Sequence, residues 1–157
     1  MFTPRLRART PSAMPVGRAR LDGRRLAFHK VGRDGSGKCD VPPDAGGCVH
    51  GVLFRLAEAE LALLDAFEGC GAGYERQAVR VMPDAGGAVT ALTYVATRID
   101  ARLRPFDWYL RHVLAGAREH GLPADYVAGI DAVLAVRDPD AARRRRELQV
   151  HAGDGGH

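Results

Sequence analysis

The order of strand-like and helix-like segments constrains the fold of this chain more than any other feature of the sequence. Short apolar runs bounded by Gly, Pro and Asp predict strands, and these runs are residues 16–21, 24–29, 48–56, 74–82 and 88–96. Apolar spacing and helix-start residues predict helices, at residues 5–10, 58–67, 106–117 and 124–134 and after Asp140. Because strands and helices do not alternate regularly, we predict an α+β fold with a small mixed or antiparallel sheet, curled like a barrel and flanked by helices.

Two turn signals predict how the strands pair. Asp22 and Gly23 join residues 16–21 to residues 24–29, and a two-residue Asp-Gly link is the strongest short hairpin signal. Residues 83–87 predict the turn of a second hairpin. Residues 32–47 are crowded with Gly, Asp, Ser and Pro, so we expect a long loop there.

The length of 157 residues is enough for one compact domain and short for two. We expect that domain over residues 1–136, followed over residues 137–157 by a polar, Arg-rich helix and a flexible tail that carries no chemistry. No apolar run approaches the about 20 residues that a membrane span requires, and the N-terminus lacks the apolar core of a secretory signal. We therefore predict a cytoplasmic protein with no membrane partner, whose oligomeric state stays open.

Cysteine and histidine spacing argues against a metal or cofactor site. Cys39, Cys48 and Cys70 are scattered and odd in number, which predicts reduced thiols and gives no metal-binding pair. No zinc-protease, dinucleotide or phosphate-loop motif occurs in the chain. We expect His112 to face solvent and His120 to lie at the C-terminal end of a helix, so the prediction is no metal and no cofactor.

The net charge of +4 is concentrated in arginine clusters near the two ends of the chain, including Arg143 to Arg146. A nucleic-acid reader is expected to interleave aromatic residues with its basic ones, and these clusters contain almost none. Solvated helix faces are therefore the favoured interpretation, and nucleic-acid binding is a minor alternative.

Glu68 is the residue that the helix pattern singles out for chemistry. It follows Leu61 and Leu64 at helical spacing, so the last inward position of the predicted helix carries a carboxylate. The glycine-rich stretch after it lets the backbone turn sharply. Spacing alone leaves a second interpretation open, since a glutamate before a glycine is ordinarily a surface residue at a helix end.

Several segments, in their order and spacing, resemble the γ-glutamylcyclotransferase family. They are residues 9–13, 17–21, 26–28, 49–53, 64–69, 73–74, 93–96, 109–110 and 116–123. The most specific of them are the Glu-Gly element at Glu68 and Gly69 and the Gly-Ala-Arg-Glu-His-Gly-Leu-Pro run of residues 116–123. The resemblance extends from Met1 to about Leu134.

This resemblance implies both an activity and a set of site residues. Family members convert a γ-glutamyl amine or amino acid into 5-oxoproline and the free amine without metal or organic cofactor, and the Glu of the Glu-Gly element is their catalytic carboxylate. Carried to this chain, that residue is Glu68. Tyr74, Tyr94 and Tyr109 correspond to tyrosines near the family's binding pocket, and Phe28 is a further candidate for its wall. For all four aromatic residues, packing in the core is the alternative interpretation.

The chemistry explains why one carboxylate can suffice. The substrate's own α-amine attacks its γ-carbonyl, so the nucleophile is already tethered. A base removes the ammonium proton and an acid protonates the leaving amine, and a single glutamate placed between them does both in turn.

One element of the family pattern is missing from the 157 residues. Family members carry a Tyr-Gly-Ser-Asn loop, preceded by a strand, directly before the segment that resembles residues 1–6, and its backbone N–H groups bind anions. No Tyr-Gly-Ser-Asn occurs here. Either Met1 is an internal position of a longer chain, or the protein lacks this loop and acts as a non-catalytic binding domain.

Overall fold

The computed structural model describes residues 2–151 of the chain. Its helices and strands are α1 (Thr3–Arg7), β1 (Met14–Arg24), β2 (Ala27–Val31), β3 (Gly37–Asp40), β4 (Pro43–Arg55), α2 (Glu58–Glu68), β5 (Tyr74–Pro83), β6 (Val89–Ala96), α3 (Asp107–Glu119), α4 (Ala124–Asp131) and α5 (Ala141–Gln149).

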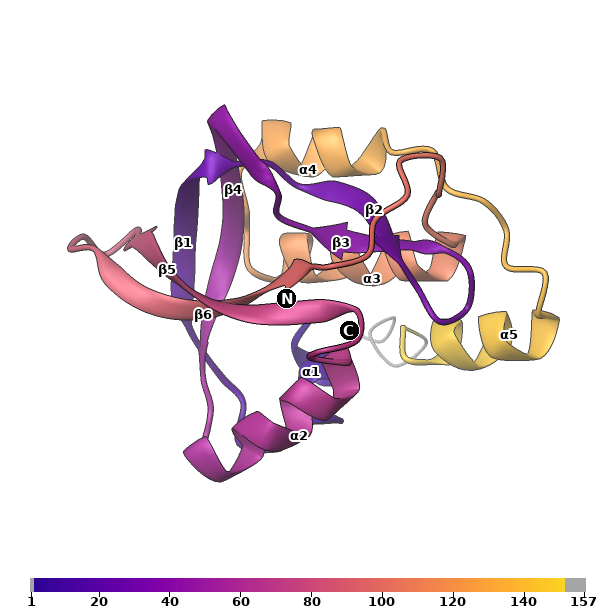
Figure 1. The fold of residues 1–157 in the computed structure, drawn as a ribbon, viewed down its shortest axis with the longest axis horizontal. Coiled ribbons are helices and arrows are strands. Elements are labelled where there is room, and N and C mark those ends of the chain that lie inside the picture. The colour runs from indigo at the N-terminus through magenta and orange to yellow at the C-terminus, as the bar shows by residue number, and fades with distance from the viewer. Residues whose placement is uncertain (1, 152–157) are drawn as a thin grey trace, which may run out of the picture.

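An antiparallel sheet with the strand order β4-β1-β5-β6 forms the centre of the fold (Figure 1). β1 pairs with β4, and β5 pairs with β6, over most of their lengths. Within residues 2–151, β1 pairs with β5 only through Ala19 with Pro83 and Arg20 with Met82. Beyond those pairs the two halves of the sheet separate and the sheet curls. The predicted α+β fold with a curled sheet and flanking helices is confirmed.

The hairpin predicted at Asp22 and Gly23 is wrong. β1 continues through both residues to Arg24 and pairs with β4 rather than with β2. The register shifts between Asp22 and Arg24, and Gly23 has a φ of 74°, so the glycine forms a bulge within the strand. The Asp-Gly pair does not form a turn because β1 pairs with the long strand β4 from Met14 to Arg24.

The long loop predicted over residues 32–47 is also wrong. This segment contains β3, which pairs with β2 in a separate hairpin, and the first residues of β4. Asp34 forms the turn between β2 and β3, since its Oδ1 accepts hydrogen bonds from the backbone N–H of Ser36 at 3.0 Å and from the Ser36 hydroxyl at 2.8 Å. The polar residues that suggested a loop therefore stabilise a tight turn.

The other predicted elements are present, with shifts at their ends. The strands at residues 48–56, 74–82 and 88–96 correspond to β4, β5 and β6, and the helices at residues 58–67, 106–117 and 124–134 to α2, α3 and α4. α1 ends at Arg7 and α4 ends at Asp131, both earlier than predicted. Gly121 follows α3 with a φ of 60°, consistent with the predicted helix end.

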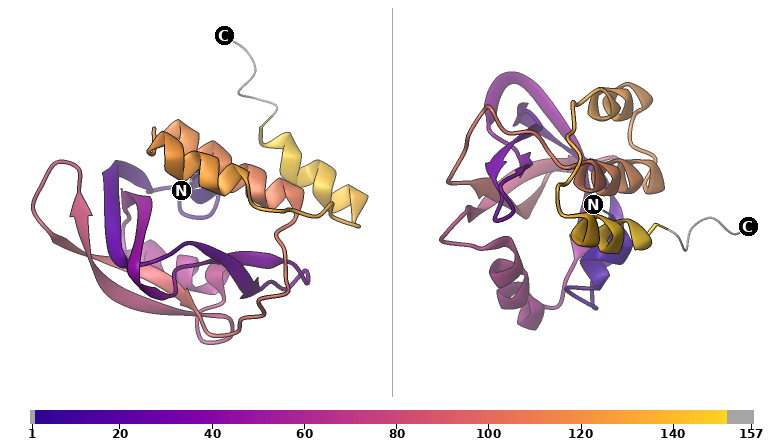
Figure 2. Two further views of the ribbon diagram at one scale, coloured as in Figure 1. Left: turned by 90° about the horizontal axis from the view of Figure 1, so that it is seen from above. Right: turned by 90° about the vertical axis from the view of Figure 1, so that its right-hand side faces the viewer.

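The core lies between α3, α4 and the strands. Its central side chains are Leu110, Leu114, Ala117, Leu122 and Ile130, each at most 7% exposed. α3, α4 and α5 gather on one side of the strands, away from α2 (Figure 2). The amphipathic spacing of α3 predicted this burial, and it fixes the helix that carries Tyr109.

The predicted arginine-rich helix is α5. Asp140 caps its N-terminus by accepting a hydrogen bond from the backbone N–H of Arg143 at 2.9 Å. α5 buries no residue, and it is attached to the rest of the domain by ion pairs such as Arg144 with Asp107 at 2.7 Å. Residues 152–157 of the expected tail lie outside the described residues.

Two further properties concern the described residues 2–151. None of the helices within residues 2–151 combines the length and apolar character needed to cross a bilayer. The three cysteines, all within the described part, are unpaired thiols.

Candidate functional site

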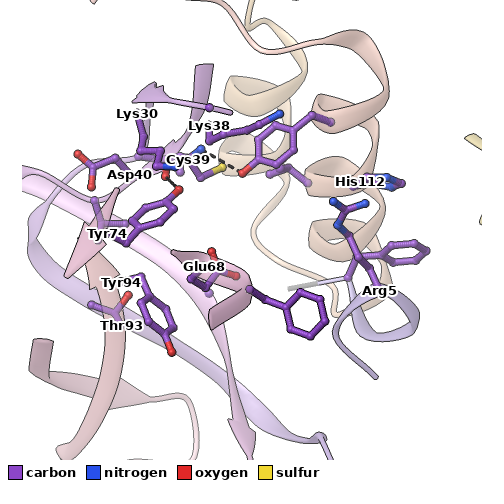
Figure 3. Close-up of a pocket in the computed structure, with 18 of the residues that line it drawn as sticks. Arg5, Lys30, Lys38, Cys39, Asp40, Glu68, Tyr74, Thr93, Tyr94 and His112 are labelled. Carbon is purple, nitrogen blue, oxygen red and sulfur yellow. Dashed lines mark hydrogen bonds between the residues drawn. The ribbon is translucent and has the colours of Figure 1, made fainter. Parts of the chain in front are cut away.

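A cavity of about 640 Å³ lies among the strands and the helices α1, α2, α3 and α5 (Figure 3). Glu68, Tyr74, Tyr94 and Tyr109 all line it, although they come from α2, β5, β6 and α3. The structure thus brings together four of the five residues predicted for the site. A concave region with a few convergent polar groups is typical of a binding or active site.

Phe28 is the predicted site residue that lies elsewhere. Its side chain packs against the core cluster of α3 and α4, and it does not line the cavity. The alternative interpretation of this residue, core packing, matches its position.

Glu68 is the last residue of α2, and Gly69 ends the helix in the left-handed conformation with a φ of 69°. The helix buries Leu64 and directs the Glu68 carboxylate into the cavity (Figure 3). The Glu68 side chain is 26% exposed, so it is accessible to a ligand within the cavity. The helical spacing that singled out Glu68 therefore reaches as far as predicted.

Arg9 holds one oxygen of this carboxylate. Its Nη1 donates to Glu68 Oε1 at 3.2 Å, and its guanidinium lies 5.5 Å from the centre of the Phe67 ring. Within residues 2–151, Glu68 Oε2 has no hydrogen-bond or ion-pair partner. Arg9 thus orients the carboxylate and leaves its second oxygen available for proton transfer.

The hydroxyls of Tyr74 and Tyr109 are both held by the backbone of Cys39 in β3. Tyr74 donates to the Cys39 carbonyl oxygen at 2.5 Å, and the Cys39 N–H donates to the Tyr109 hydroxyl oxygen at 3.0 Å. Burial is the main cause that raises the pKa of both phenols well above the ordinary value. Both side chains are therefore neutral walls of the cavity at physiological pH, and neither acts as a base.

Tyr94 is held by Asp65, which lies in α2 one turn before Glu68. Its hydroxyl donates to Asp65 Oδ1 at 2.6 Å, while Arg76 Nη1 pairs with Asp65 Oδ2 at 2.7 Å. Burial is the main cause that raises the pKa of Tyr94, and the hydrogen bond to Asp65 adds to it. Tyr94 also contacts Tyr74 edge-on, with 6.3 Å between the ring centres. The same helix turn thus positions the carboxylate and one aromatic wall.

Sequence reasoning did not find the cations of this part of the cavity. Arg9 precedes β1 and Lys30 belongs to β2, and only the tertiary fold brings them into the same cavity as Glu68. Lys30 is 7% exposed and lines the cavity, with its Nζ 4.6 Å from the centre of the Tyr74 ring. No spacing in the sequence connects these residues, so no signal predicted them.

His112 lies at the other end of the cavity, and the prediction that it faces solvent is wrong. It is 3% exposed, because the Phe2 ring stacks on it with 6.0 Å between the ring centres and Glu147 of α5 lies against it. Its Nδ1 is 2.8 Å from His151 Nε2, and its Nε2 is 3.2 Å from Glu147 Oε2, which also pairs with Arg5. Burial, with Arg5 nearby, lowers the pKa of His112 to about 4. His120 caps the C-terminus of α3, the place predicted for it.

Acidification should therefore destabilise the fold through His112. Because its pKa is lowered in the folded state to about 4, the unfolded chain binds a proton between pH about 6.5 and 4 that the folded chain does not bind. Stability that is present above pH 6.5 is lost as the pH falls through this window, by about 3 kcal/mol. Urea unfolding of the wild type and of His112→Leu at several pH values measures this. We expect a shallower pH dependence in the variant, and an unchanged slope would contradict the assignment.

Within residues 2–151, no group of three or more His, Cys, Asp or Glu side chains is placed to hold a metal ion. Among the carboxylates of the cavity, Asp34 and Asp40 have both oxygens in hydrogen bonds. Glu147 binds Arg5 and His112 through one oxygen. Glu68 is the carboxylate that stands among the tyrosines with an oxygen available.

Comparisons with known proteins agree with one another. The family model described as AIG2-like matches residues 48–130. The gamma-glutamylcyclotransferases of Homo sapiens and Bos taurus are 29% and 28% identical over 139 residues, covering 85% of this chain and 73% of each relative. A solved structure of a gamma-glutamyl cyclotransferase superposes with a TM-score of 0.86 at 24% identity, covering 95% of this chain and 92% of its own. This last likeness shows a shared fold.

Proposed function

The chain belongs to the AIG2-like family and resembles gamma-glutamylcyclotransferases, and from that premise we propose that it releases 5-oxoproline from a γ-glutamyl compound. The co-product is a free amine or amino acid. The observation that carries the proposal is the position of Glu68, whose carboxylate faces a cavity with one oxygen held by Arg9 and the other available.

The reaction exchanges one amide bond for another within the substrate. The α-amine forms a bond to the γ-carbonyl carbon, the ring closes, and the bond from that carbon to the leaving nitrogen breaks. The α-ammonium loses two protons on becoming the lactam N–H, and the leaving nitrogen gains two protons on becoming an ammonium group. Because these proton transfers balance, Glu68 ends each cycle as a carboxylate and no co-reactant is needed.

The three tyrosines of the cavity support the assignment of Glu68 as the acid and base. The phenols of Tyr74, Tyr94 and Tyr109 stay protonated at physiological pH, so they cannot serve as the base. Their rings form an apolar wall that fits the methylene groups of a γ-glutamyl chain. A flexible substrate reacts only when its amine lies next to its own carbonyl, and such a wall favours that folded conformer.

The test is the release of 5-oxoproline by the purified 157-residue protein. A panel of γ-glutamyl amino acids and γ-glutamyl amines is incubated with the protein, and products are quantified by chromatography and mass spectrometry. We expect 5-oxoproline and the free amine in equal amounts from at least one substrate class. Absence of release above the rate without protein, for every member of the panel, would overturn the proposal.

A further inference from the structure

Within residues 2–151, Lys30 is a buried cation that lacks a hydrogen-bond or ion-pair partner. It is 7% exposed, and within residues 2–151 its ammonium group has no hydrogen bond or ion pair. Most other cations that line the cavity are paired, as in Arg9 with Glu68, Lys38 with Asp34 and Arg5 with Glu147. A buried lysine is ordinarily paired with a carboxylate, because removing an ammonium group from water is costly.

The Lys30 ammonium lies close to the turn that follows Glu68. Its Nζ is 4.6 Å from the centre of the Tyr74 ring and 3.0 Å from the position that a Cβ at Gly73 would occupy. Glu68 attracts it, since this carboxylate is the main influence that raises the pKa of Lys30 against the lowering effect of burial. The two groups are nevertheless too far apart for a direct ion pair. Figure 3 shows Lys30, Tyr74 and Glu68 lining one part of the cavity.

This arrangement matches the charges of one end of the proposed substrate. A γ-glutamyl group carries an ammonium and a carboxylate on the same α-carbon. Glu68 needs to reach the ammonium, so the carboxylate must lie a few ångströms away, next to a group of positive charge. Lys30 supplies that charge, and within residues 2–151 it forms no ion pair with Glu68, so Glu68 Oε2 stays open to the ammonium.

We propose that Lys30 binds the α-carboxylate of the γ-glutamyl substrate and thereby places the α-amine at Glu68. The inference rests on the proposed function and assigns a substrate-binding residue to it. Binding of the carboxylate gives the buried ammonium the partner that it lacks. The contact with the Tyr74 ring holds the side chain in place before substrate arrives.

The test compares two small lactams that differ only in the carboxylate. 5-Oxoproline retains the α-carboxylate of the substrate, and 2-pyrrolidinone has the same ring without it. Dissociation constants are measured by calorimetry or by NMR titration of the full chain. For the wild type we expect 5-oxoproline to bind about 10- to 100-fold more tightly, the range for a hydrogen bond between charged groups.

Three variants test whether the preference for 5-oxoproline depends on Lys30. Lys30→Met keeps the length of the side chain without its charge and is expected to abolish the preference for 5-oxoproline. Lys30→Arg keeps the charge and is expected to retain part of the preference. Arg33→Met removes an exposed cation from the same cavity and is expected to change the preference by less than about threefold, because exposed charges are screened by solvent.

Three results would overturn the inference. They are equal binding of the two lactams by the wild type, full preference in Lys30→Met, and loss of preference in Arg33→Met with retention in Lys30→Met. The wild-type comparison remains decisive if Lys30→Met fails to fold. The binding test is separate from turnover. A wild type that prefers 5-oxoproline through Lys30 but releases none from any γ-glutamyl compound would refute the activity and leave the carboxylate site standing.

Discussion

Replacing Glu68 by glutamine is expected to lower kcat for 5-oxoproline release by about 10³-fold, within the range that general acid–base catalysis contributes. Glutamine keeps the size of the side chain, and its amide oxygen can still accept the hydrogen bond that Arg9 donates to Glu68. It cannot take up or return a proton. We therefore expect KM to change by less than about threefold, since the substrate contacts are retained. Steady-state assays of 5-oxoproline formation give both constants.

Glu147→Gln is the matched control for this variant. Glu147 is a second glutamate that lines the cavity, but its carboxylate is bound to Arg5 and His112 at the end away from the tyrosines. We expect its kcat to stay within about threefold of the wild type, because it takes no part in proton transfer. Retained activity in Glu68→Gln together with lost activity in Glu147→Gln would contradict the assignment of the base.

Truncating Asp138 to alanine is expected to lower the free energy of unfolding by about 3 kcal/mol, as for other buried charge networks that lose one partner. Asp138 is 2% exposed. Its carboxylate accepts hydrogen bonds from Trp108 Nε1 at 2.7 Å, from Arg143 Nε and Nη2 at 2.6 Å each, and from the backbone N–H of Asp140 at 2.8 Å. Without it, a buried indole N–H loses its acceptor and α5 loses its anchor. Denaturant unfolding measures the loss.

Asp84→Asn is the control for Asp138→Ala. Asp84 pairs with Arg18 at 2.7 Å, but its side chain is 55% exposed, so its removal is expected to cost less than about 1 kcal/mol. Equal losses in the two variants would contradict the importance of burial at Asp138.

Asp138 also contributes to the acid sensitivity of the fold. The hydrogen bonds from Arg143 are the main cause that lowers the pKa of Asp138 in the folded state. Its contribution is therefore present above the unfolded pKa of about 4 and is lost as the pH falls below it. Asp138→Asn removes this part of the pH dependence.

Local patterns in the sequence correctly predicted the elements whose structure depends on residues close together in the sequence. The helical spacing of Leu61, Leu64 and Glu68 placed the carboxylate at the inward end of α2, and the structure confirms that the helix reaches it. The spacing in α3 predicted the buried face of that helix. In both cases the periodicity that decides burial lies within a single element.

The errors arose where a distant segment decided the outcome. The Asp22 and Gly23 turn signal was overridden by β4, which pairs with β1 from far along the chain. His112 was predicted to face solvent, but Glu147 of the distant helix α5 packs against it. Lys30 belongs to the β2–β3 hairpin, and β3 was predicted to be part of a loop. The sequence pattern therefore did not predict that Lys30 is buried beside Tyr74.

The central claim is that the substrate's own α-amine closes the ring, and isotope labelling tests it most directly. A γ-glutamyl amino acid carrying ¹⁵N at the glutamyl α-amine is incubated with the wild-type protein, and the products are followed by NMR. The account predicts that the ¹⁵N label appears in the lactam nitrogen of 5-oxoproline, with an equal amount of unlabelled amino acid. Labelled glutamate as the first product would show hydrolysis by water and would contradict it.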